Sequence, residues 1–344
     1  MSETAPQPGS AAWHAQVEEP VIDAEQPLID PHHHFWLPEH DSPWGSYELD
    51  DLWADTGSGH QVVKTVFIEC HAHYRTAGPE HLQPVGETEW VAGIAGESAG
   101  GIAGQAAVGG IVSFADLRLG ERLGEVLDAH EEAGAGLFRG IRHAGARHPQ
   151  PDAAFRTPSR GAPAGLFRDN AFQEGVRLLG RRGYTYESWH YHTQQRNYRE
   201  LALAAPDTTM IVDHLGYPLG TGPFAGRLDE VFAAWKPAIA ALAECPNVYC
   251  KLGGLAQPDN GFALHTAARP PTSDELVALQ GHWYRHAIEC FGPERCLFES
   301  NFPVDKVSVS YRVLWNAFKK LVAEFSADER HAMLYGTAAR VYRL

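Results

Sequence analysis

The sequence has few cysteines, no long apolar run and a shortage of positive charge, and each of these features argues against a class of proteins. Its five cysteines are odd in number and include no Cys-x-x-Cys pair, which favours free thiols in a reducing cytoplasm. No stretch approaches the roughly 20 apolar residues of a transmembrane helix. Residues 1–20 lack the basic start and apolar run of a secretory signal. We therefore expect a cytoplasmic protein without a membrane partner.

The acidic balance of the chain argues against nucleic acid as a partner. Lys and Arg number 28 against 43 Asp and Glu, a formal net charge of −15, and such a chain repels phosphate backbones and anionic lipid surfaces. An apolar fraction of 44% with 21% charged residues is ordinary for a globular protein. We expect a small-molecule substrate. The polar arm over residues 1–27 would lie against the rest of the chain or against a second copy in a homo-oligomer.

Eight short runs rich in Val, Ile, Tyr and Phe predict β-strands, and many are bounded by Gly, Pro or Asn. They cover residues 28–36, 62–70, 107–117, 137–143, 184–192, 208–216, 247–255 and 296–303. Helical patterns such as 119–135 and 228–246 lie between them. About eight strand–helix units predict an α/β fold, a (β/α)₈ TIM barrel, as one domain over residues 28–344. A doubly wound sheet is the alternative, but no Gly-rich phosphate loop follows the first strand.

Polar side chains stand at the end of nearly every predicted strand. Barrel enzymes place functional groups at the carboxyl ends of their strands, and core strands selected only for packing would not end this way. The residues concerned are His32, His33, His34, Glu69, His71, Asp116, Arg142, His143, His190, His192, Asp213, His214, Lys251, Glu299 and Asn301.

The first strand carries three consecutive histidines in "LIDPHHHFW". Because side chains alternate along a strand, Asp30, His32 and His34 should share one face and His33 the other. Two imidazoles so placed can hold one metal ion or one substrate group, and Asp30 could orient a ring by accepting its N–H. A histidine-rich strand end that simply faces water is the alternative.

The segment "DPHHHFW" at 30–36 resembles the opening of the amidohydrolase superfamily, especially the amidohydrolase-2 branch with its sugar-acid lactonases and 2-pyrone-4,6-dicarboxylate lactonase. Further matching segments, in the same order, are "GIRH" at 140–143, "YHTQ" at 191–194, "DHLGYP" at 213–218, "KLGGL" at 251–255 and "RCLFESNFPVDK" at 295–306. The resemblance implies a barrel hydrolase, most simply a lactonase, in which water attacks a small cyclic ester or related carbonyl compound at the barrel mouth.

The resemblance also implies a metal site. His32, His34 and one of His192 or His214 would hold a divalent ion, with zinc the expected metal, while operation without metal stays open. Arg142 matches an arginine that holds an anionic or carbonyl group of the substrate, a task suited to a two-donor guanidinium. A structural ion pair is its alternative.

The eighth strand departs from the family pattern. Asn301 stands where the superfamily usually has an aspartate as general base, and an amide cannot take a proton at neutral pH. Asp305 or Glu299 could supply the carboxylate instead, or a metal-bound hydroxide could need none. Asn301 itself could donate a hydrogen bond to the developing oxyanion.

Other residues carry weaker expectations. Trp36, Trp189 and Tyr217 could line a substrate pocket, although packing is their commoner role. Buried Glu69 and Lys251 would need a partner, either each other or the substrate.

Two other functions remain open at this point. The first is a metal-dependent, non-oxidative decarboxylase of an aromatic or unsaturated acid, a chemistry of relatives that share the His-x-His start. The second is a non-catalytic binding barrel that has lost its base.

Overall fold

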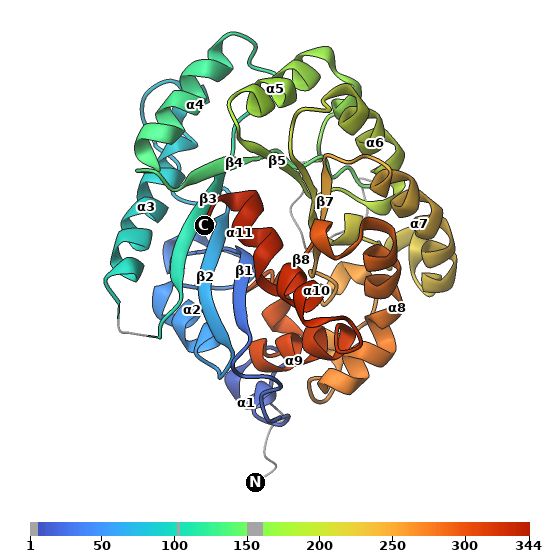
Figure 1. Cartoon of the computed structure of the whole chain (residues 1–344). Coiled ribbons are helices and arrows are strands. Elements are labelled where there is room, and N and C mark those ends of the chain that lie inside the picture. The colour runs from blue at the N-terminus through green and yellow to red at the C-terminus, as the bar shows by residue number, and fades with distance from the viewer. Residues whose placement is uncertain (1–5, 102–103, 150–160) are drawn as a thin grey trace.

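The protein, seen in a computed structural model that describes residues 6–101, 104–149 and 161–344, is built on eight parallel strands in the order β1 to β8 (Figure 1). The strands are β1 Pro27–His33, β2 Gln61–Ile68, β3 Ala107–Ser113, β4 Phe138–Arg142, β5 Thr185–Ser188, β6 Met210–Val212, β7 Val248–Leu252 and β8 Cys296–Phe298. The ring of strands with helices between them is the (β/α)₈ barrel, so the prediction is confirmed and the doubly wound alternative is wrong.

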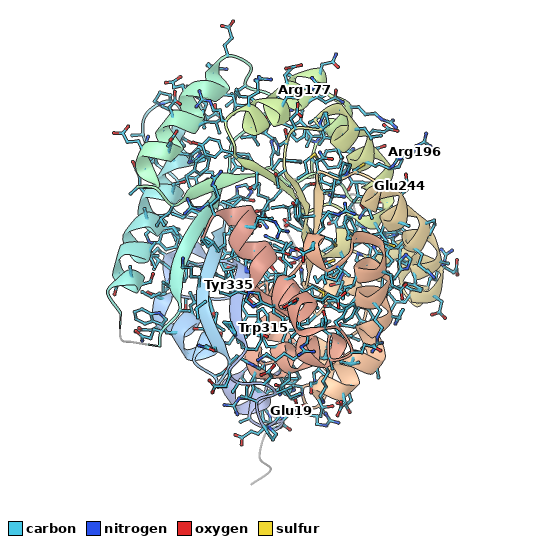
Figure 2. All side chains as sticks on the ribbon, in the orientation of Figure 1. Glu19, Arg177, Arg196, Glu244, Trp315 and Tyr335 are labelled. Atoms are coloured by element: carbon cyan, nitrogen blue, oxygen red, sulfur yellow. The ribbon has the colours of Figure 1, made fainter. Side chains whose placement is uncertain are left out.

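The described helices surround the ring. They are α1 Ala11–His14, α2 Leu49–Thr56, α3 Val85–Ala99, α4 Arg122–Ala133, α5 Asn170–Arg181, α6 Gln195–Ala204, α7 Leu228–Ala243, α8 Ser273–Phe291, α9 Tyr311–Leu321, α10 Ala327–His331 and α11 Thr337–Tyr342. Charged side chains such as Arg196 and Glu244 point outward from this layer, whereas Trp315 of α9 is fully buried (Figure 2). Of the described helices, none is long and apolar enough to cross a membrane.

The barrel closes between β1 and the segment that follows β8. The backbone N–H of His34 donates to the carbonyl of Phe302 at 2.9 Å, and that of Asn301 donates to the carbonyl of His32 at 3.0 Å. Two segments that carry predicted site residues are thereby joined edge to edge, and the carboxyl ends of β1 and β8 lie together.

Inside the ring, apolar side chains of five strands pack against the last helix. The cluster consists of Ile29, Val66, Ile68, Val112, Ile211, Leu297, Ala338, Val341 and Tyr342. Helix α11 lies over the ring of strands in Figure 1, and Leu344 beyond it packs where Gly109 and Gly110 of β3 leave room for its side chain. The amino end of the barrel is thus filled, and the polar side chains gather at the other end.

The described part of the predicted arm is held against the barrel. The indole N–H of Trp13 donates to the carbonyl of Ala267 at 3.2 Å. The carboxylate of Glu19 accepts from the backbone N–H of Ser273 at 2.7 Å and from the amide of Asn316 at 3.0 Å. All five cysteines are free thiols, in agreement with the expectation from their number and spacing.

Candidate active site

Ionisable side chains from seven strands meet at the carboxyl end of the barrel, all of them buried. They are His32 and His34 of the β1 end, Glu69 after β2, Arg142 of β4, Glu187 of β5, Asp213 and His214 after β6, Lys251 of β7 and Glu299 after β8. We call this group the central cluster. Burial of charged groups is costly unless they are paired, so the pairing within the cluster decides what it can do.

Glu299 connects two histidines that are far apart in the sequence. Its Oε1 accepts from Nδ1 of His214 at 2.6 Å and from the backbone N–H of His214 at 3.2 Å. Its Oε2 lies 2.6 Å from Nδ1 of His32. The ring of His32 lies 4.7 Å from that of His214 and 5.0 Å from that of His34, measured between centroids. The structure therefore brings His32, His34 and His214 together around one carboxylate.

These contacts define which ring nitrogens hold protons. His214 donates from Nδ1 to Glu299, so its Nε2 keeps a lone pair. Arg142 can only donate, so Nε2 of His32, which is 3.3 Å from Nη1 of Arg142, accepts and the proton of that ring is on Nδ1. Burial lowers the pKa of His214 to about 3, and burial with the charge of Lys251 lowers the pKa of His32 well below its usual value. Both rings are neutral at pH 7.

The glycines of the "KLGGL" segment make room for this arrangement. Gly254 has φ +70°, and a Cβ there would lie 2.2 Å from Nδ1 of His214. A Cβ at Gly253 would lie 2.2 Å from the carbonyl oxygen of Glu299. Only glycine tolerates both the left-handed backbone and the close approach at position 254.

Arg142 pairs with Glu69, so of the two expected partners for Glu69, Lys251 or the substrate, the first is wrong. Its Nε donates to Oε1 of Glu69 at 2.7 Å, and its Nη1 lies 3.9 Å from Oδ2 of Asp213. Burial alone would raise the pKa of Glu69, but its electrostatic interactions with His71 and Arg142 outweigh burial and lower it. Arg142 is 9 % exposed, so it lies at the solvent side of the central cluster.

Lys251 pairs with a carboxylate that sequence reasoning missed. Its Nζ donates to Oε2 of Glu187 at 2.6 Å and lies 3.2 Å from Nδ1 of His32, 3.6 Å from Asp213 and 3.9 Å from Glu299. Burial would lower the pKa of Lys251, but these carboxylates raise it, so the amine stays charged. Strand alternation, which puts Glu187 on the face opposite Tyr186, was the available signal.

The central cluster has more carboxyl groups than cationic side chains. Glu69, Glu187, Asp213 and Glu299 face only Arg142 and Lys251 as permanent cations. Within the described part of the chain, no hydrogen-bond donor with good geometry reaches either oxygen of Asp213 or Oε2 of Glu299. Buried carboxyl oxygens without donors are the surroundings that a divalent cation satisfies.

The donor atoms present fit a zinc ion. Ligand atoms of His32, His214 and Glu299 all lie within 4.8 Å of one another, and two imidazoles with a carboxylate are a common zinc set. This group differs from the predicted one, because His34 and His192 do not belong to it. His34 donates from Nδ1 to the carbonyl of Ile68 at 2.8 Å, with its Nε2 left as a lone pair.

His192 lies apart from the central cluster, and its hydrogen bond argues against the predicted ligand role. Its Nδ1 accepts from the backbone N–H of Leu219 at 3.1 Å, so the neutral ring carries its proton on Nε2 and has no lone pair left for a metal. Its ring packs against Phe224 at 4.9 Å between centroids. His190 also lies elsewhere, since it contacts Ser188 and Gln195.

Asn301 and Asp305 form a buried unit beside the cluster. Asn301 has φ +57° and donates from Nδ2 to Oδ1 of Asp305 at 2.9 Å. The other carboxyl oxygen of Asp305 accepts from the backbone N–H of Ala256 at 3.0 Å, and burial raises the pKa of Asp305 to about 8. Of the two carboxyls predicted as alternatives, Glu299 therefore lies in the cluster, whereas Asp305 braces the Asn301 loop.

The first strand alternates as predicted, with one correction. His33 points away from the cluster, and its ring packs against Phe35 and Phe67 at 4.7 and 6.0 Å. Asp30 does not orient a histidine ring, because its carboxylate accepts from the backbone N–H of Ser300 and from the hydroxyl of Tyr311, both at 2.9 Å.

Aromatic side chains border the cluster on two sides. The ring of Trp36 lies 5.2 Å from that of His34. On the other side, Tyr217 lies 6.2 Å from His214 and 5.6 Å from Trp189. These three are the aromatic residues named from the sequence, and their placement is compatible with a pocket lining.

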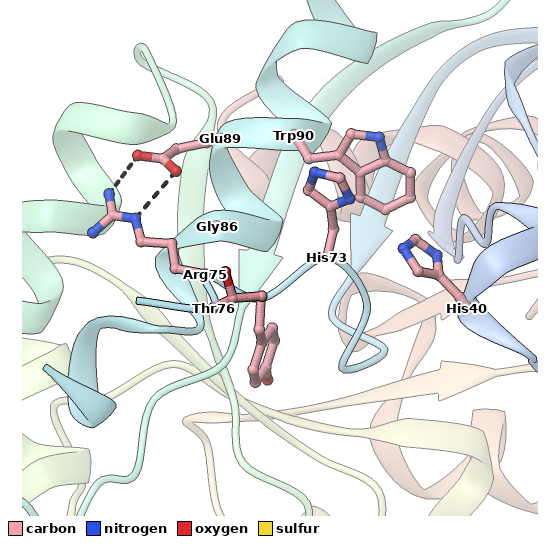
Figure 3. A pocket seen from close by; sticks show the side chains of 8 residues that line it. His40, His73, Arg75, Thr76, Gly86, Glu89 and Trp90 are labelled. Atoms are coloured by element: carbon pink, nitrogen blue, oxygen red, sulfur yellow. Dashed lines mark hydrogen bonds and ion pairs between the residues drawn. The ribbon is translucent and has the colours of Figure 1, made fainter. Parts of the chain in front are cut away.

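A cavity of about 760 Å³ lies next to this region, beside the segment that follows β2 (Figure 3). Its lining includes His40, with His73 stacked on Trp90 at 5.2 Å, and the ion pair of Arg75 with Glu89 crosses one side. The cavity does not include any residue of the central cluster.

Glu87, at the start of α3, holds the segment that borders this cavity. It is buried, and its Oε1 accepts from the backbone N–H groups of Cys70 and Ala72 at 3.1 and 2.7 Å. It stands in the first turn of α3, where a carboxylate suits the helix dipole. Burial and the neighbouring Glu69 raise the pKa of Glu87 to about 8.

Comparison with known proteins gives consistent matches over the barrel. The sequence profile of the family described as amidohydrolase matches residues 29–344. An uncharacterized protein, y4mH, of Sinorhizobium fredii is 31% identical over 92% of this chain and 98% of its own length. An L-fucono-1,5-lactonase of Burkholderia multivorans is 27% identical over 92% of this chain and 96% of its own.

A solved amidohydrolase of Burkholderia multivorans with bound zinc has a similar structure. It is 25% identical, with a TM-score of 0.71 over 92% of this chain and 99% of that one. The expected resemblance is confirmed along the whole barrel.

Proposed function

Since the chain belongs to the amidohydrolase family, we propose that it is a lactonase that hydrolyses the cyclic ester of a small sugar acid to the open-chain acid. The single observation that carries this proposal is Glu299 held between His32 and His214, with Arg142 beside them. A carboxylate-oriented imidazole next to a guanidinium combines a proton acceptor with a group that stabilises negative charge, which ester hydrolysis requires.

His214 is the proposed proton acceptor. Glu299 accepts its Nδ1 proton, which leaves the lone pair of Nε2 free to take a proton from the attacking water. The carboxylate then stabilises the imidazolium that forms, by the logic of a carboxylate–histidine pair. As the oxyanion collapses, the ester bond between the carbonyl carbon and the ring oxygen breaks, and the imidazolium returns its proton to that oxygen, which becomes the hydroxyl of the open-chain acid. His32 suits this step less well, because its Nε2 already accepts from Arg142 at 3.3 Å.

Arg142 is the proposed partner of the carbonyl oxygen. Its guanidinium is fixed by Glu69 on one side and by His32 on the other, so its orientation is set before substrate binds. A preorganised donor that faces the carbonyl oxygen stabilises the oxyanion as water adds. Trp36 and Tyr217 would bound the ring of the substrate, and their apolar faces would exclude excess water.

A zinc ion held by His32, His214 and Glu299 would take the lone pair of His214 and the one that His32 offers to Arg142. His214 would then be a ligand in place of the proton acceptor, and the metal would supply a lowered pKa of water at this site. Metal analysis of protein purified without chelator tests that assignment. We expect close to stoichiometric zinc in the wild type and loss of the metal in Glu299→Gln.

Acid release from a panel of 1,4- and 1,5-aldonolactones, followed in weakly buffered solution with a pH indicator, tests the function. We expect turnover of at least one six-carbon lactone, because a relative similar over the whole barrel is named L-fucono-1,5-lactonase. His214→Asn in the same assay is the matched control for spontaneous ring opening. Absence of turnover across the panel, with and without added zinc, would contradict the proposal.

The same material distinguishes the two alternatives. Release of CO₂ from an aromatic or unsaturated acid without acid release from lactones would identify a decarboxylase. Gain of activity in Asn301→Asp, in a protein otherwise inert, would identify a binding barrel that has lost its base.

We also propose the cytoplasm as the place of action, since five free thiols are typical of a reducing compartment. Assembly into a homo-oligomer stays a prediction.

A further inference from the structure

Helix α11 lies over the end of the barrel opposite the proposed reaction site. One of its side chains contacts the central cluster. Tyr342 is fully buried, and it packs inside the ring of strands together with Ile29, Val66 and Ile211. Its hydroxyl donates to Oε1 of Glu187 at 2.6 Å. A tyrosine on a helix outside the ring of strands therefore supplies a hydrogen bond to a carboxylate of the site.

Glu187 links Tyr342 to Lys251 by hydrogen bonds. One oxygen of Glu187 accepts from Tyr342 and the other accepts from Nζ of Lys251, at 2.6 Å each. The amine also lies over the ring of Tyr342, 5.6 Å from its centroid. Tyr342 thus contacts Lys251 in two independent ways, through the carboxylate and through the face of its ring.

Lys251 in turn meets the groups proposed to carry the reaction. Its Nζ lies 3.2 Å from Nδ1 of His32 and 3.9 Å from Oε2 of Glu299. A lysine side chain is long and flexible. Without Glu187 and Tyr342, its charge could move toward Asp213, whose Oδ1 is 3.6 Å away.

We propose that Tyr342 is a positioning residue of the active site, which fixes Lys251 beneath His32 and Glu299 through Glu187. This inference rests on the proposed lactonase function for its kinetic test. Tyr342 itself does not reach the substrate side, because it lies on α11 in the apolar cluster inside the barrel, whereas His32 and Glu299 lie at the carboxyl ends of β1 and β8. Replacing Tyr342 should therefore slow the chemical step and have little influence on substrate binding.

Tyr342→Phe tests the hydroxyl alone, because phenylalanine keeps the ring under Lys251. We expect kcat to fall on the order of tenfold to 100-fold, as for a small misplacement of a catalytic group, with KM unchanged. Tyr342→Leu removes the ring as well and should lose more. Tyr198→Phe is the matched control, since its hydroxyl is also fully buried and donates at 3.0 Å, but to the backbone carbonyl of Ile211.

A double-mutant cycle shows whether Tyr342 acts through Glu187. Because both variants remove the same link, Tyr342→Phe combined with Glu187→Gln should be no slower than Glu187→Gln alone. Losses that multiply in the double variant would overturn the inference. An equal fall of kcat in Tyr342→Phe and Tyr198→Phe would overturn it too. If Tyr342→Phe does not fold, the kcat of Glu187→Gln is compared with that of Tyr198→Phe instead.

A spectroscopic measurement separates this inference from the proposed function. The ¹⁵N signals of the His32 ring, assigned with His32→Asn, should shift in Tyr342→Phe and stay in place in Tyr198→Phe. That shift would support the positioning role even for a wild type that hydrolyses no lactone, an outcome that refutes only the proposed function. Unchanged His32 signals in Tyr342→Phe would overturn the positioning role.

Discussion

Replacing Asp305 by asparagine asks whether this carboxyl is a proton acceptor or a protonated brace. In the folded protein its two oxygens accept from Asn301 and from the backbone N–H of Ala256. Burial raises its pKa from an ordinary 3.8 to about 8. With that pKa, Asp305 keeps its proton at pH 7 and cannot serve as a general base there.

The size of the effect follows from the two pKa values. Below about pH 4 the carboxyl is protonated in both the folded and the unfolded chain, and above about pH 8 it is ionised in both. Between these limits only the folded state of the wild type holds the proton, so the free energy of unfolding falls by about 1.4 kcal/mol for each pH unit as pH rises. The free energy of unfolding of Asp305→Asn lacks this dependence on pH. It is lowered only by a constant of about 1–3 kcal/mol, because one hydrogen-bond donor is left without an acceptor.

Urea unfolding of both proteins at pH 5, 6 and 7 measures this difference. We expect the stability advantage of the wild type to shrink by about 1.4 kcal/mol per pH unit. Other buried carboxyls with raised pKa, such as Asp30 and Glu299, titrate in both proteins and cancel. If the free energies of unfolding of the two proteins change in parallel with pH, the reasoning is refuted. Asp305 would then be ionised in the folded state and would again be a candidate base. The activity of Asp305→Asn at pH 7 should also stay within about tenfold of the wild type, since loss of a true base costs about 10²–10⁴-fold.

Three further substitutions test the central cluster. Glu299→Gln should lower kcat for a lactone by about 10²–10⁴-fold, with an unchanged circular dichroism spectrum; a variant as active as the wild type would remove Glu299 from the mechanism. Arg142→Lys keeps the charge but cannot hold two partners through a planar fork, so we expect kcat/KM to fall by about 10²–10³-fold, and undiminished kcat/KM would contradict this. Gly254→Ala should lower both Tm and kcat, because its Cβ would lie 2.2 Å from Nδ1 of His214. Gly136→Ala is its control, with φ +86° but open space around the new Cβ, and equal kcat in the two glycine variants would argue against the clash.

The fold was predictable because the barrel strands are apolar runs separated by helical patterns. The predicted runs extend too far at their carboxyl ends, most clearly in β5 and β6. After Ser188 the chain runs irregularly to a 3-10 turn at His192–Gln194, and after Val212 it turns at once through Asp213–Gly216, where His214 and Leu215 take left-handed backbone angles. The sequence pattern carries no sign of those angles.

The site was predictable only where a motif marked it. His32, His34, His214 and Arg142 stand in short recognisable segments, and the structure brings them together. Pairings across the barrel could not be predicted, because they depend on which strands face each other. The true partners of Glu69 and Lys251 are Arg142 and Glu187. Glu187 and Tyr342 stand outside the recognisable motifs. Strand alternation could have placed Glu187 on the inner face of its strand, but it could not have named Tyr342 as its partner.

The closed pairing of the central cluster has a consequence for laboratory evolution of this enzyme. Arg142, Lys251, His214 and Glu299 are each held by partners from other strands, so randomising one of them alone leaves its neighbours without compensation. The side chains of Trp36, His73 and Tyr217 instead pack against neighbouring rings. Libraries aimed at new substrates should therefore vary these aromatic residues around the strand ends and keep the residues of the central cluster unchanged.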